Sequence, residues 1–332
     1  MRRLRRRRDR GAIAVLVALS MVALLGFTAL GVDGGQVWSD RKQLQNGADA
    51  GALAIAQACA QGACGVYTST ADAYAKSNKL DGNATGTVTN LDTTAGSVTV
   101  QSSSTRTLLF APVLGIPSAN ITASATATWQ PIGGGTFIPL TISLCAFYAQ
   151  TNPPAIVGDP IPTNTPMTIY YATPISSSLP ISQDPSGACG SNPGAEPAGG
   201  FNWIGNQNKD CTATISAGGV IASQPGNTPK GCTWGSSLAG QTIQIPVFDY
   251  CVPSTGCANG ANGSYHIYAI ATFTITAYCF DTADYANVTQ NCTGNYADHY
   301  ISGYFVSFAS IGSGWTTSGS PNLGTDQVSL TQ

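Results

Sequence analysis

An uncharged apolar segment, from Gly11 to Val32, constrains this chain more than any other feature of its sequence. It holds 22 residues, and only Ser20 and Thr28 among them are polar. A helix of that length measures about 33 Å, enough for a hydrocarbon core of about 30 Å, and it satisfies its own backbone hydrogen bonds in lipid. The sequence therefore predicts a transmembrane helix over residues 11–32. Its membrane-anchoring residues include Gly11, Leu16, Leu25 and Val32.

Seven arginines and one aspartate precede this segment within the first ten residues. Positive charge beside an apolar span stays on the cytoplasmic side. We therefore expect a cytoplasmic arm over residues 1–10, a single pass through the cell membrane, and export of residues 33–332 to the periplasm or cell surface. A cleaved signal peptide is the alternative, with Ala29-Leu30-Gly31 as its cleavage site. Its apolar core would run only about 7–15 residues, so we favour the retained anchor.

The residues after the arm are acidic overall, with 7 basic and 15 acidic side chains. They contain no basic patch, which argues against nucleic acid as a partner. The basic arm is explained by topology and by attraction to an anionic lipid bilayer. All ten cysteines follow the apolar segment, which indicates an oxidising compartment and disulfide bonds.

Short spacings along the chain predict three disulfides, Cys59–Cys64, Cys251–Cys257 and Cys279–Cys292. Two more would join the remaining four cysteines in an order that the sequence leaves open. Those four are Cys145, Cys189, Cys211 and Cys232. No Cys-x2-Cys pair or Cys/His arrangement of zinc-ligand spacing occurs, so we expect no metal and no cofactor.

The segment from Asp33 to about Ala60 is predicted to continue the membrane helix outward. Trp38 suits an interfacial aromatic position, Arg41 and Lys42 indicate a watery setting, and Gly34-Gly35 offers a hinge. Small and apolar residues recur at three- and four-residue spacing, as on a helix that packs along one face. That face packs either in this chain's own core, which we favour, or against a neighbouring subunit. The predicted packing residues are Gln43, Leu44, Gln45, Asn46, Ala48, Asp49 and Ala52.

Residues 33–130 are predicted to form a small α+β unit. A second helix follows Ser69 or Thr70, either of which is expected to cap it. Alternating β-branched and small residues then predict antiparallel strands. The apolar run Thr107–Ile116 is expected to pack under that sheet. The predicted strands are Thr87–Thr89, Ser97–Gln101 and Ile121–Trp129.

The rest of the chain predicts a second, β-rich region, so the whole fold is expected to be α+β. Residues 131–136, with three consecutive glycines, are expected to be a flexible linker. Residues 137–315 are expected to form an antiparallel β domain stapled by disulfides, and residues 316–332 a loose tail. The clearest strand patterns are Met167–Tyr171, Thr242–Phe248, Ser264–Cys279 and Tyr300–Phe308.

Several of these segments resemble one family. Arg10-Gly11-Ala12, Gly31-Val32-Asp33 and the run Gln43–Ala54 resemble the N-terminal region of TadE/TadG-like proteins of the Tad (Flp) pilus-assembly system. Phe110–Ser118 and Ile121–Ala127 are similar to that family's strand pair. The resemblance, over about residues 10–130, implies a bacterial membrane-anchored structural or accessory component of a Tad/Flp pilus or secretion apparatus. It also implies that its partners are other pilus-assembly or pilin-like proteins.

The chain departs from that family's pattern in two places. Some members carry a von Willebrand A domain with an Asp-x-Ser-x-Ser metal site, whereas Asp184-Pro-Ser-Gly-Ala188 lacks the last serine. True prepilins have a glutamate five residues into the mature helix, where this chain has Leu16. We therefore expect neither a metal-dependent adhesion site nor processing like that of a major pilin.

Catalytic motifs are absent from the sequence, which has no Gly-x-Ser-x-Gly, Walker or His-Glu-x-x-His pattern. We expect a structural protein and not an enzyme. An anchored hydrolase around His266 or His299 is one alternative, and Asp281, Asp284 and Asp298 are expected to be solvated turn residues and not a calcium site. A surface adhesion domain is the other alternative, with an aromatic binding face on the C-terminal sheet. That face would comprise Tyr265, Tyr268, Phe273, Tyr278 and Tyr304.

Overall fold

The structure, a computed structural model, shows two compact units. It describes residues 9–149, 165–171, 200–205, 210–224, 226, 228–229, 231–252, 263–288, 292–295, 298–311, 314–317 and 321–331. Unit 1 comprises Met1–Ile55, Gly65–Thr128 and Leu330–Gln332, and unit 2 comprises Ala56–Cys64 and Trp129–Ser329. Helices and largely antiparallel sheets are both present, so the predicted α+β class is confirmed.

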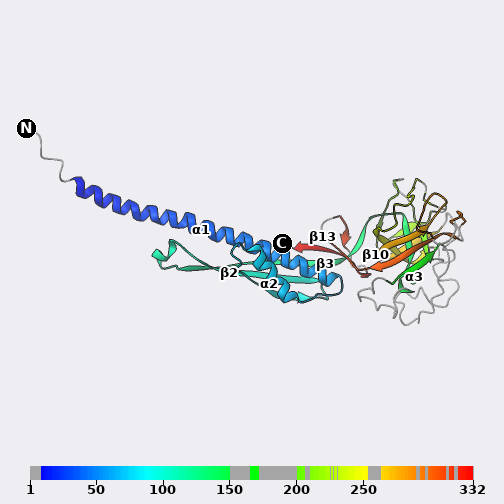
Figure 1. Cartoon of the computed structure of the whole chain (residues 1–332), viewed down its shortest axis with the longest axis horizontal. Helices are drawn as coiled ribbons and strands as arrows, with labels where there is room; N and C mark the ends of the chain where they lie inside the picture. Colours follow the sequence, from blue (N-terminus) through cyan, green and yellow to red (C-terminus); the bar gives the residue numbers. More distant parts are fainter. Residues whose placement is uncertain are drawn as a thin grey trace, which may run out of the picture. The chain divides into compact units, whose positions relative to one another are not determined.

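A single helix, α1 (Asp9–Ala60), contains both the apolar segment and the helix expected beyond it (Figure 1). It runs for 52 residues. The predicted hinge is wrong, because Gly34 and Gly35 both lie within the helix. Each glycine costs an α-helix only about 1 kcal/mol, which the helix-forming residues on either side offset.

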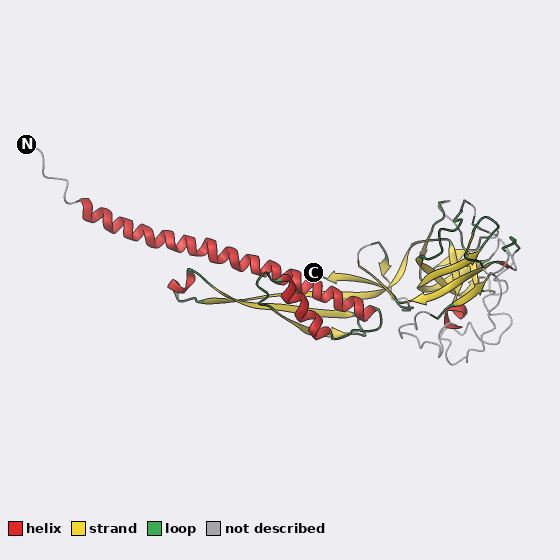
Figure 2. Ribbon diagram, in the orientation of Figure 1, coloured by secondary structure: helices red, strands yellow, loops and turns green. Residues whose placement is uncertain are grey.

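Unit 1 packs two helices on a three-stranded antiparallel part of a sheet (Figure 2). Alternation along the strands sends one set of side chains inward, and Val98 and Val100 on β2 are fully buried. The predicted strands are therefore confirmed, with longer bounds. The elements are α2 (Tyr67–Asn78), β1 (Thr85–Asp92), β2 (Ser97–Thr107), the short turn η1 (Ala111–Leu114) and β3 (Ser118–Phe137).

Two expectations for unit 1 are wrong. Neither Ser69 nor Thr70 caps α2, which starts two residues earlier; both hydroxyls donate instead to the Val66 carbonyl. The apolar run Thr107–Ile116 does not pack under the sheet. It forms the turn between β2 and β3, where Val113 is 88% exposed. A Pro-Val-Leu-Gly sequence favours a tight turn over a buried strand, because Gly115 adopts a positive φ that closes it.

Unit 2 contains most of the β-structure. The strongest sequence patterns, at Thr242, Ser264 and Tyr300, begin the strands β9, β10 and β12, which pair in the order β12-β10-β9. The elements that follow β3 in the chain are β4 (Leu140–Ser143), α3 (Leu144–Ala149), β5 (Met167–Tyr170), β6 (Phe201–Trp203), β7 (Ala213–Ser216), β8 (Val220–Ala222), β9 (Thr242–Val252), β10 (Ser264–Cys279), β11 (Tyr285–Ala286), β12 (Tyr300–Val306), β13 (Phe308–Ile311), β14 (Thr316–Thr317) and β15 (Thr325–Thr331).

Aromatic and branched side chains fill the main core of unit 2. Phe273 on β10 packs edge-on against Phe305 on β12, and Phe147 on α3 meets Phe305 in the same way. All three side chains are almost completely buried. Such pairs add about 0.5–1.5 kcal/mol each beyond the burial of their area. The sheet and the short helix are therefore held by one aromatic cluster.

The expected linker at residues 131–136 lies inside strand β3. Its glycines fit there because other parts of unit 2 approach closely. A Cβ on Gly134 would come within 2.7 Å of the Ile215 carbonyl oxygen, and one on Gly135 within 2.4 Å of the Trp315 ring. These glycines therefore indicate close packing and not flexibility.

The expected loose tail is wrong as well, because residues 316–332 contain β14 and β15. Thr325, Asp326 and Val328 on β15 are buried, and β15 pairs in parallel with β13. The polar composition of this segment did not indicate a buried strand. Its burial is possible because the Thr325 hydroxyl is hydrogen-bonded to the Thr272 hydroxyl at 2.9 Å.

Disulfides join Cys59 to Cys64 and Cys279 to Cys292, two of the three local pairs that spacing predicts, and Cys211 to Cys232. Cys145 and Cys251 are also disulfide-bonded. The other two cysteines, Cys189 and Cys257, lie outside the described residues, as do residues 1–8 of the basic arm and the Asp184 segment.

Candidate functional site

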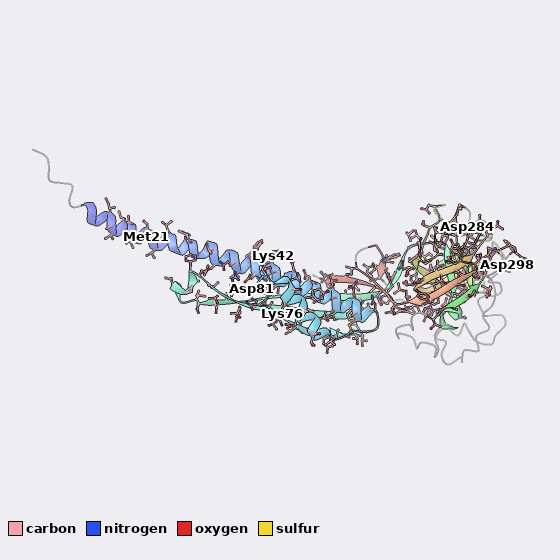
Figure 3. The ribbon with its side chains drawn as sticks, viewed as in Figure 1. Met21, Lys42, Lys76, Asp81, Asp284 and Asp298 are labelled. Carbon is pink, nitrogen blue, oxygen red and sulfur yellow. A yellow bond between two sulfur atoms is a disulfide. The ribbon has the colours of Figure 1, made fainter. Side chains whose placement is uncertain are left out.

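The first half of α1 presents apolar side chains that no other described part of unit 1 covers. Leu16 is 64% exposed and Phe27 is 72% exposed. Figure 3 shows Met21 on this bare stretch and Lys42 farther along the helix. Among the described residues α1 is the one helix long and apolar enough to cross a membrane. Of the predicted anchoring residues, Gly11, Leu16 and Val32 face outward here, and the side chain of Leu25 is not among those described.

The second half of α1, unlike the exposed first half, is packed in the core of unit 1. Leu44, Ala48 and Ala52 are fully buried. Gly47 sits among them, and an added Cβ there would lie 3.0 Å from the Cα of Ala75 on α2. Small residues thus let α1 and α2 approach closely, and the three apolar residues of the predicted packing set lie inside this chain's own unit.

Of the polar residues in the predicted packing set, some form hydrogen bonds within unit 1 and one is exposed to solvent. The Gln43 side-chain oxygen accepts a hydrogen bond from the Leu80 N–H at 2.8 Å. The Gln45 amide donates to Asp49 at 2.7 Å and to the Ser124 carbonyl at 3.2 Å. Asn46 is exposed. A groove of about 480 Å³ beside them is lined by Gln45, Asp49, Ser124, Ala125, Thr126, Leu330 and Thr331.

Asp33 fixes the β2–β3 turn to α1 where the apolar segment ends. Its carboxylate accepts hydrogen bonds from the backbone N–H groups of Leu109, Phe110 and Ala111, at 2.9, 3.0 and 2.7 Å. Three backbone donors from one turn therefore satisfy the Asp33 carboxylate.

A partly buried ion cluster joins α1, the end of α2 and β2. Lys79 lies 3.2 Å from Asp40 and 2.9 Å from Asp81, and its side chain is 1% exposed. Arg106 reaches both aspartates, at 3.6 and 3.5 Å. A hydrogen bond from the Asn83 backbone N–H, followed by one from the Lys79 ammonium, lowers the pKa of Asp81. Two cations and two anions therefore balance one another inside unit 1.

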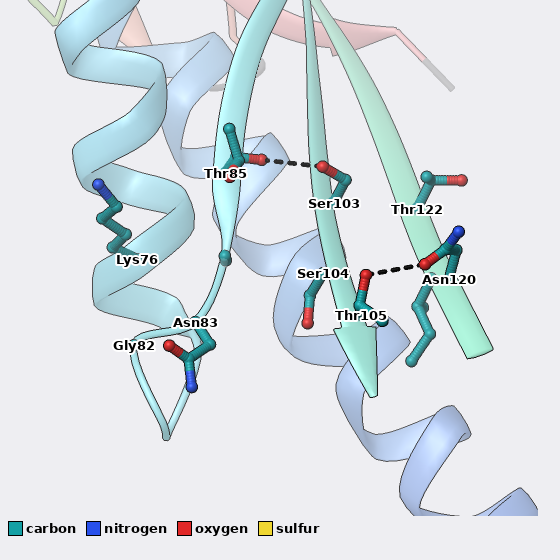
Figure 4. A pocket seen from close by; sticks show the side chains of 11 residues that line it. Lys76, Gly82, Asn83, Thr85, Ser103, Ser104, Thr105, Asn120 and Thr122 are labelled. Carbon is teal, nitrogen blue, oxygen red and sulfur yellow. Dashed lines mark hydrogen bonds between the residues drawn. The ribbon is translucent and has the colours of Figure 1, made fainter. Parts of the chain in front are cut away.

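A polar groove of about 590 Å³ opens on the other side of the sheet of unit 1 (Figure 4). Figure 4 shows hydroxyl and amide side chains along it, including the 2.8 Å hydrogen bond from Thr105 to Asn120. Lys76 is its single cationic side chain, and it pairs with Asp72 at 2.6 Å. No cluster of three metal-ligating side chains occurs among the described residues of the chain.

The two histidines lie in unit 2 and differ in setting. His266 Nδ1 lies 2.6 Å from Asp249, and its ring stacks on Tyr250. Within the described residues, no serine, threonine or cysteine side chain is hydrogen-bonded to the His266 ring. His299 is fully buried, and desolvation lowers its pKa against the opposing charges of Asp281 and Asp298. The His266–Asp249 pair therefore has the orienting contact of a general base, and no nucleophile of the described residues is hydrogen-bonded to it.

The expectation that Asp284 is a solvated turn residue is wrong, because this aspartate is only 3% exposed. It accepts backbone hydrogen bonds from Trp234 and Gly235 at 2.6 and 2.7 Å, so it ties a loop to the β10–β11 turn. Figure 3 labels this aspartate and Asp298 in unit 2.

The proposed aromatic binding face is also not formed. Tyr265, Phe273 and Tyr278 are at most 2% exposed, so most of that set belongs to the cores of unit 2. Burial raises the pKa of the Tyr278 hydroxyl, which donates to the Gly235 carbonyl at 2.8 Å. The hydroxyl has a structural partner and is not directed at a ligand.

Residues 11–58 match the family model Tad, described as "Putative Flp pilus-assembly TadE/G-like". The matched segment covers the apolar half of α1, Asp33 and nearly all of the packing half. No curated protein and no solved structure matches the chain. The resemblance seen in the sequence is therefore confirmed for the N-terminal segment, and it points to a pilus-associated component.

Proposed function

We propose that this chain, with its TadE/G-like segment 11–58, is a membrane-anchored structural component of a Tad/Flp-type pilus or secretion apparatus. In this role the chain acts by assembly and packing and not by turnover. The basic arm faces the cytoplasm, residues 11–32 of α1 cross the bilayer, and the rest of unit 1 lies on the exported side with unit 2.

One observation carries the proposal: α1 is continuous from its exposed apolar half into the core of unit 1. Exposed leucine and phenylalanine side chains on one half require a covering that the described residues do not provide. A bilayer supplies it, and the seven arginines before the segment favour the orientation with the N-terminus inside. Disulfides in unit 2 agree with an oxidising compartment outside the membrane.

The partner surface that we propose is the exposed strip of α1 around Asn46, together with the groove beside Gln45 and Asp49. The buried residues Leu44, Ala48 and Ala52 stabilise unit 1 and are not available to a partner. Other pilus-assembly or pilin-like proteins are the expected partners, which rests on the family match.

Crosslinking in native membranes tests this proposal. A photoreactive amino acid at Asn46 should yield adducts with pilus-assembly proteins, since the position is exposed on a helix that stays folded. The same group at Leu80, which is 93% exposed in the same unit, is the matched control for non-specific capture. Equal adducts at both positions, or none with pilus components, would contradict the proposed role.

A further inference from the structure

The turn between β2 and β3 exposes a second apolar surface in unit 1. We call residues Leu108–Ile116 the β2–β3 tip. Leu109 is 64% exposed, Val113 is 88% exposed and Ile116 is 53% exposed. The tip carries no charged side chain. Exposed branched residues gathered on one turn are unusual on a surface that faces only water.

The tip lies where the proposed membrane span ends. Three hydrogen bonds to Asp33 fix Leu109, Phe110 and Ala111 against α1 one residue beyond the apolar segment. Figure 2 shows η1, the short red turn at the end of the β2–β3 hairpin, alongside α1 and toward its apolar half. The exposed surface of the tip therefore continues that of the helix.

The charge pattern of α1 places this level of the helix within the bilayer. Asp33 is the only charged residue between Arg10 and Asp40. Residues 11–39, in which Asp33 carries the one charge, measure about 43 Å as a helix, close to the roughly 40–45 Å of a bilayer with its headgroups. Trp38, 65% exposed and 5.8 Å from the Lys42 ammonium, suits the headgroup level five residues beyond Asp33.

Asp33 itself would be costly in that position without the tip. A carboxylate removed from water needs donors, and the three backbone N–H groups of the tip supply them. The contact thus serves both partners: the tip satisfies the carboxylate, and the carboxylate holds the tip at the membrane.

We infer that the β2–β3 tip inserts Leu109, Val113 and Ile116 into the outer leaflet beside α1, as a second membrane contact. The occupant of this surface is lipid. The inference rests on the proposed membrane anchor, and it adds that unit 1 is held against the bilayer at two points. Two contacts fix the tilt of unit 1 relative to the membrane, which one helix alone leaves free.

Depth-dependent quenching tests the inference on the full-length chain in phosphatidylcholine vesicles. No described cysteine is a free thiol, so one introduced cysteine can be labelled with an environment-sensitive fluorophore. The test position is Val113→Cys. Leu24→Cys, in the proposed span, reports on the anchor, and Leu80→Cys is an equally exposed apolar control beside Gln43, about 15 Å farther along α1.

Nitroxide-labelled lipid should quench the labels at Leu24 and Val113 and leave the label at Leu80 unquenched. Quenching at Leu24 without quenching at Val113 would overturn the tip insertion and leave the anchor standing. Absence of quenching at both would overturn the anchor too. A blue-shifted but unquenched label at Val113 would show protein and not lipid on the tip, which also overturns the inference.

Asp33→Asn tests the positioning role of the carboxylate. In this variant the quenching at Val113 should fall toward the Leu80 level while the quenching at Leu24 stays unchanged. Unchanged quenching at both positions would show that Asp33 does not hold the tip.

Discussion

The buried charged residues in unit 1 are held by opposite charges or by backbone donors, because burial removes the water that would otherwise solvate them. Lys79 is the clearest case, with a side chain 1% exposed between Asp40 and Asp81. A buried pair is expensive to form and more expensive to break, since the remaining partner keeps its charge without compensation.

Replacing Lys79 with methionine should therefore destabilise unit 1 by about 3–5 kcal/mol. The reason is the Asp40 carboxylate, which is 3% exposed and would keep only the Arg106 guanidinium, at 3.6 Å, as a cationic partner. Hydrogen exchange of the α2 amides in the detergent-solubilised full-length chain measures the loss. Adding Asp40→Asn to the variant should recover part of it. A double variant no more stable than Lys79→Met alone would count against this account.

Asp326 makes the stability of unit 2 depend on pH. Burial raises its pKa to about 6 from 3.8, against the lowering effect of its hydrogen bonds from Asn322. Because the folded pKa is the higher one, the protonated carboxyl stabilises the fold fully below the unfolded pKa. This contribution is lost as the pH rises through about 6.

Asp326→Asn should remove that pH dependence. The variant should be more stable than the parent at about pH 8, by up to about 3 kcal/mol, and should gain nothing at about pH 4. Thermal unfolding of the full-length chain at both pH values measures the difference. An equal effect at the two values would show that the carboxyl does not titrate as described.

Close approach of backbones decides how the elements of unit 1 fit together. A Cβ on Gly86 of β1 would lie 2.1 Å from the Ala71 carbonyl oxygen on α2, whereas one on Gly51 of α1 meets Val100 at an ordinary 3.5 Å. The Gly86 N–H also donates to Asp72 at 3.3 Å. Glycine is required at the first position and only permitted at the second.

Alanine at these two positions should act in opposite directions. Gly86→Ala should destabilise the chain by about 1–3 kcal/mol, because α2 must move away from β1. Gly51→Ala, the control, should stabilise it by up to about 1 kcal/mol through helix propensity. Thermal unfolding in detergent compares them. A harmless Gly86→Ala would mean that α2 and β1 are not packed this closely.

The sequence predicted the elements whose side-chain periodicity is strong, such as α1, β2 and β10, because period alone distinguishes an amphipathic helix from a half-buried strand. It did not predict the Asp33 contact or the Lys79 cluster. Those partners stand far apart in the chain, as Asp33 and Ala111 do, and only the fold brings them together. The prediction of a flexible linker at the glycines near Gly134 was wrong for a related reason, because both flexible linkers and close backbone packing favour glycine.

At the scale of the whole molecule, the two halves of α1 have different surroundings. One half is apolar and exposed, and the other is buried in unit 1. The charge on either side of the apolar half is asymmetric, with seven arginines before it. In the proposed function a single helix links the bilayer to a folded exported unit, and the family match of residues 11–58 covers both halves.

Alkaline extraction of cell envelopes that contain the full-length chain tests the membrane claim most directly. The chain should remain in the membrane pellet, because a spanning helix is held by hydrophobic burial and not by charge. A variant with Leu16→Arg and Leu24→Arg, which breaks the apolar segment, should shift to the soluble fraction. Release of the unaltered full-length chain into the alkaline supernatant would contradict the account.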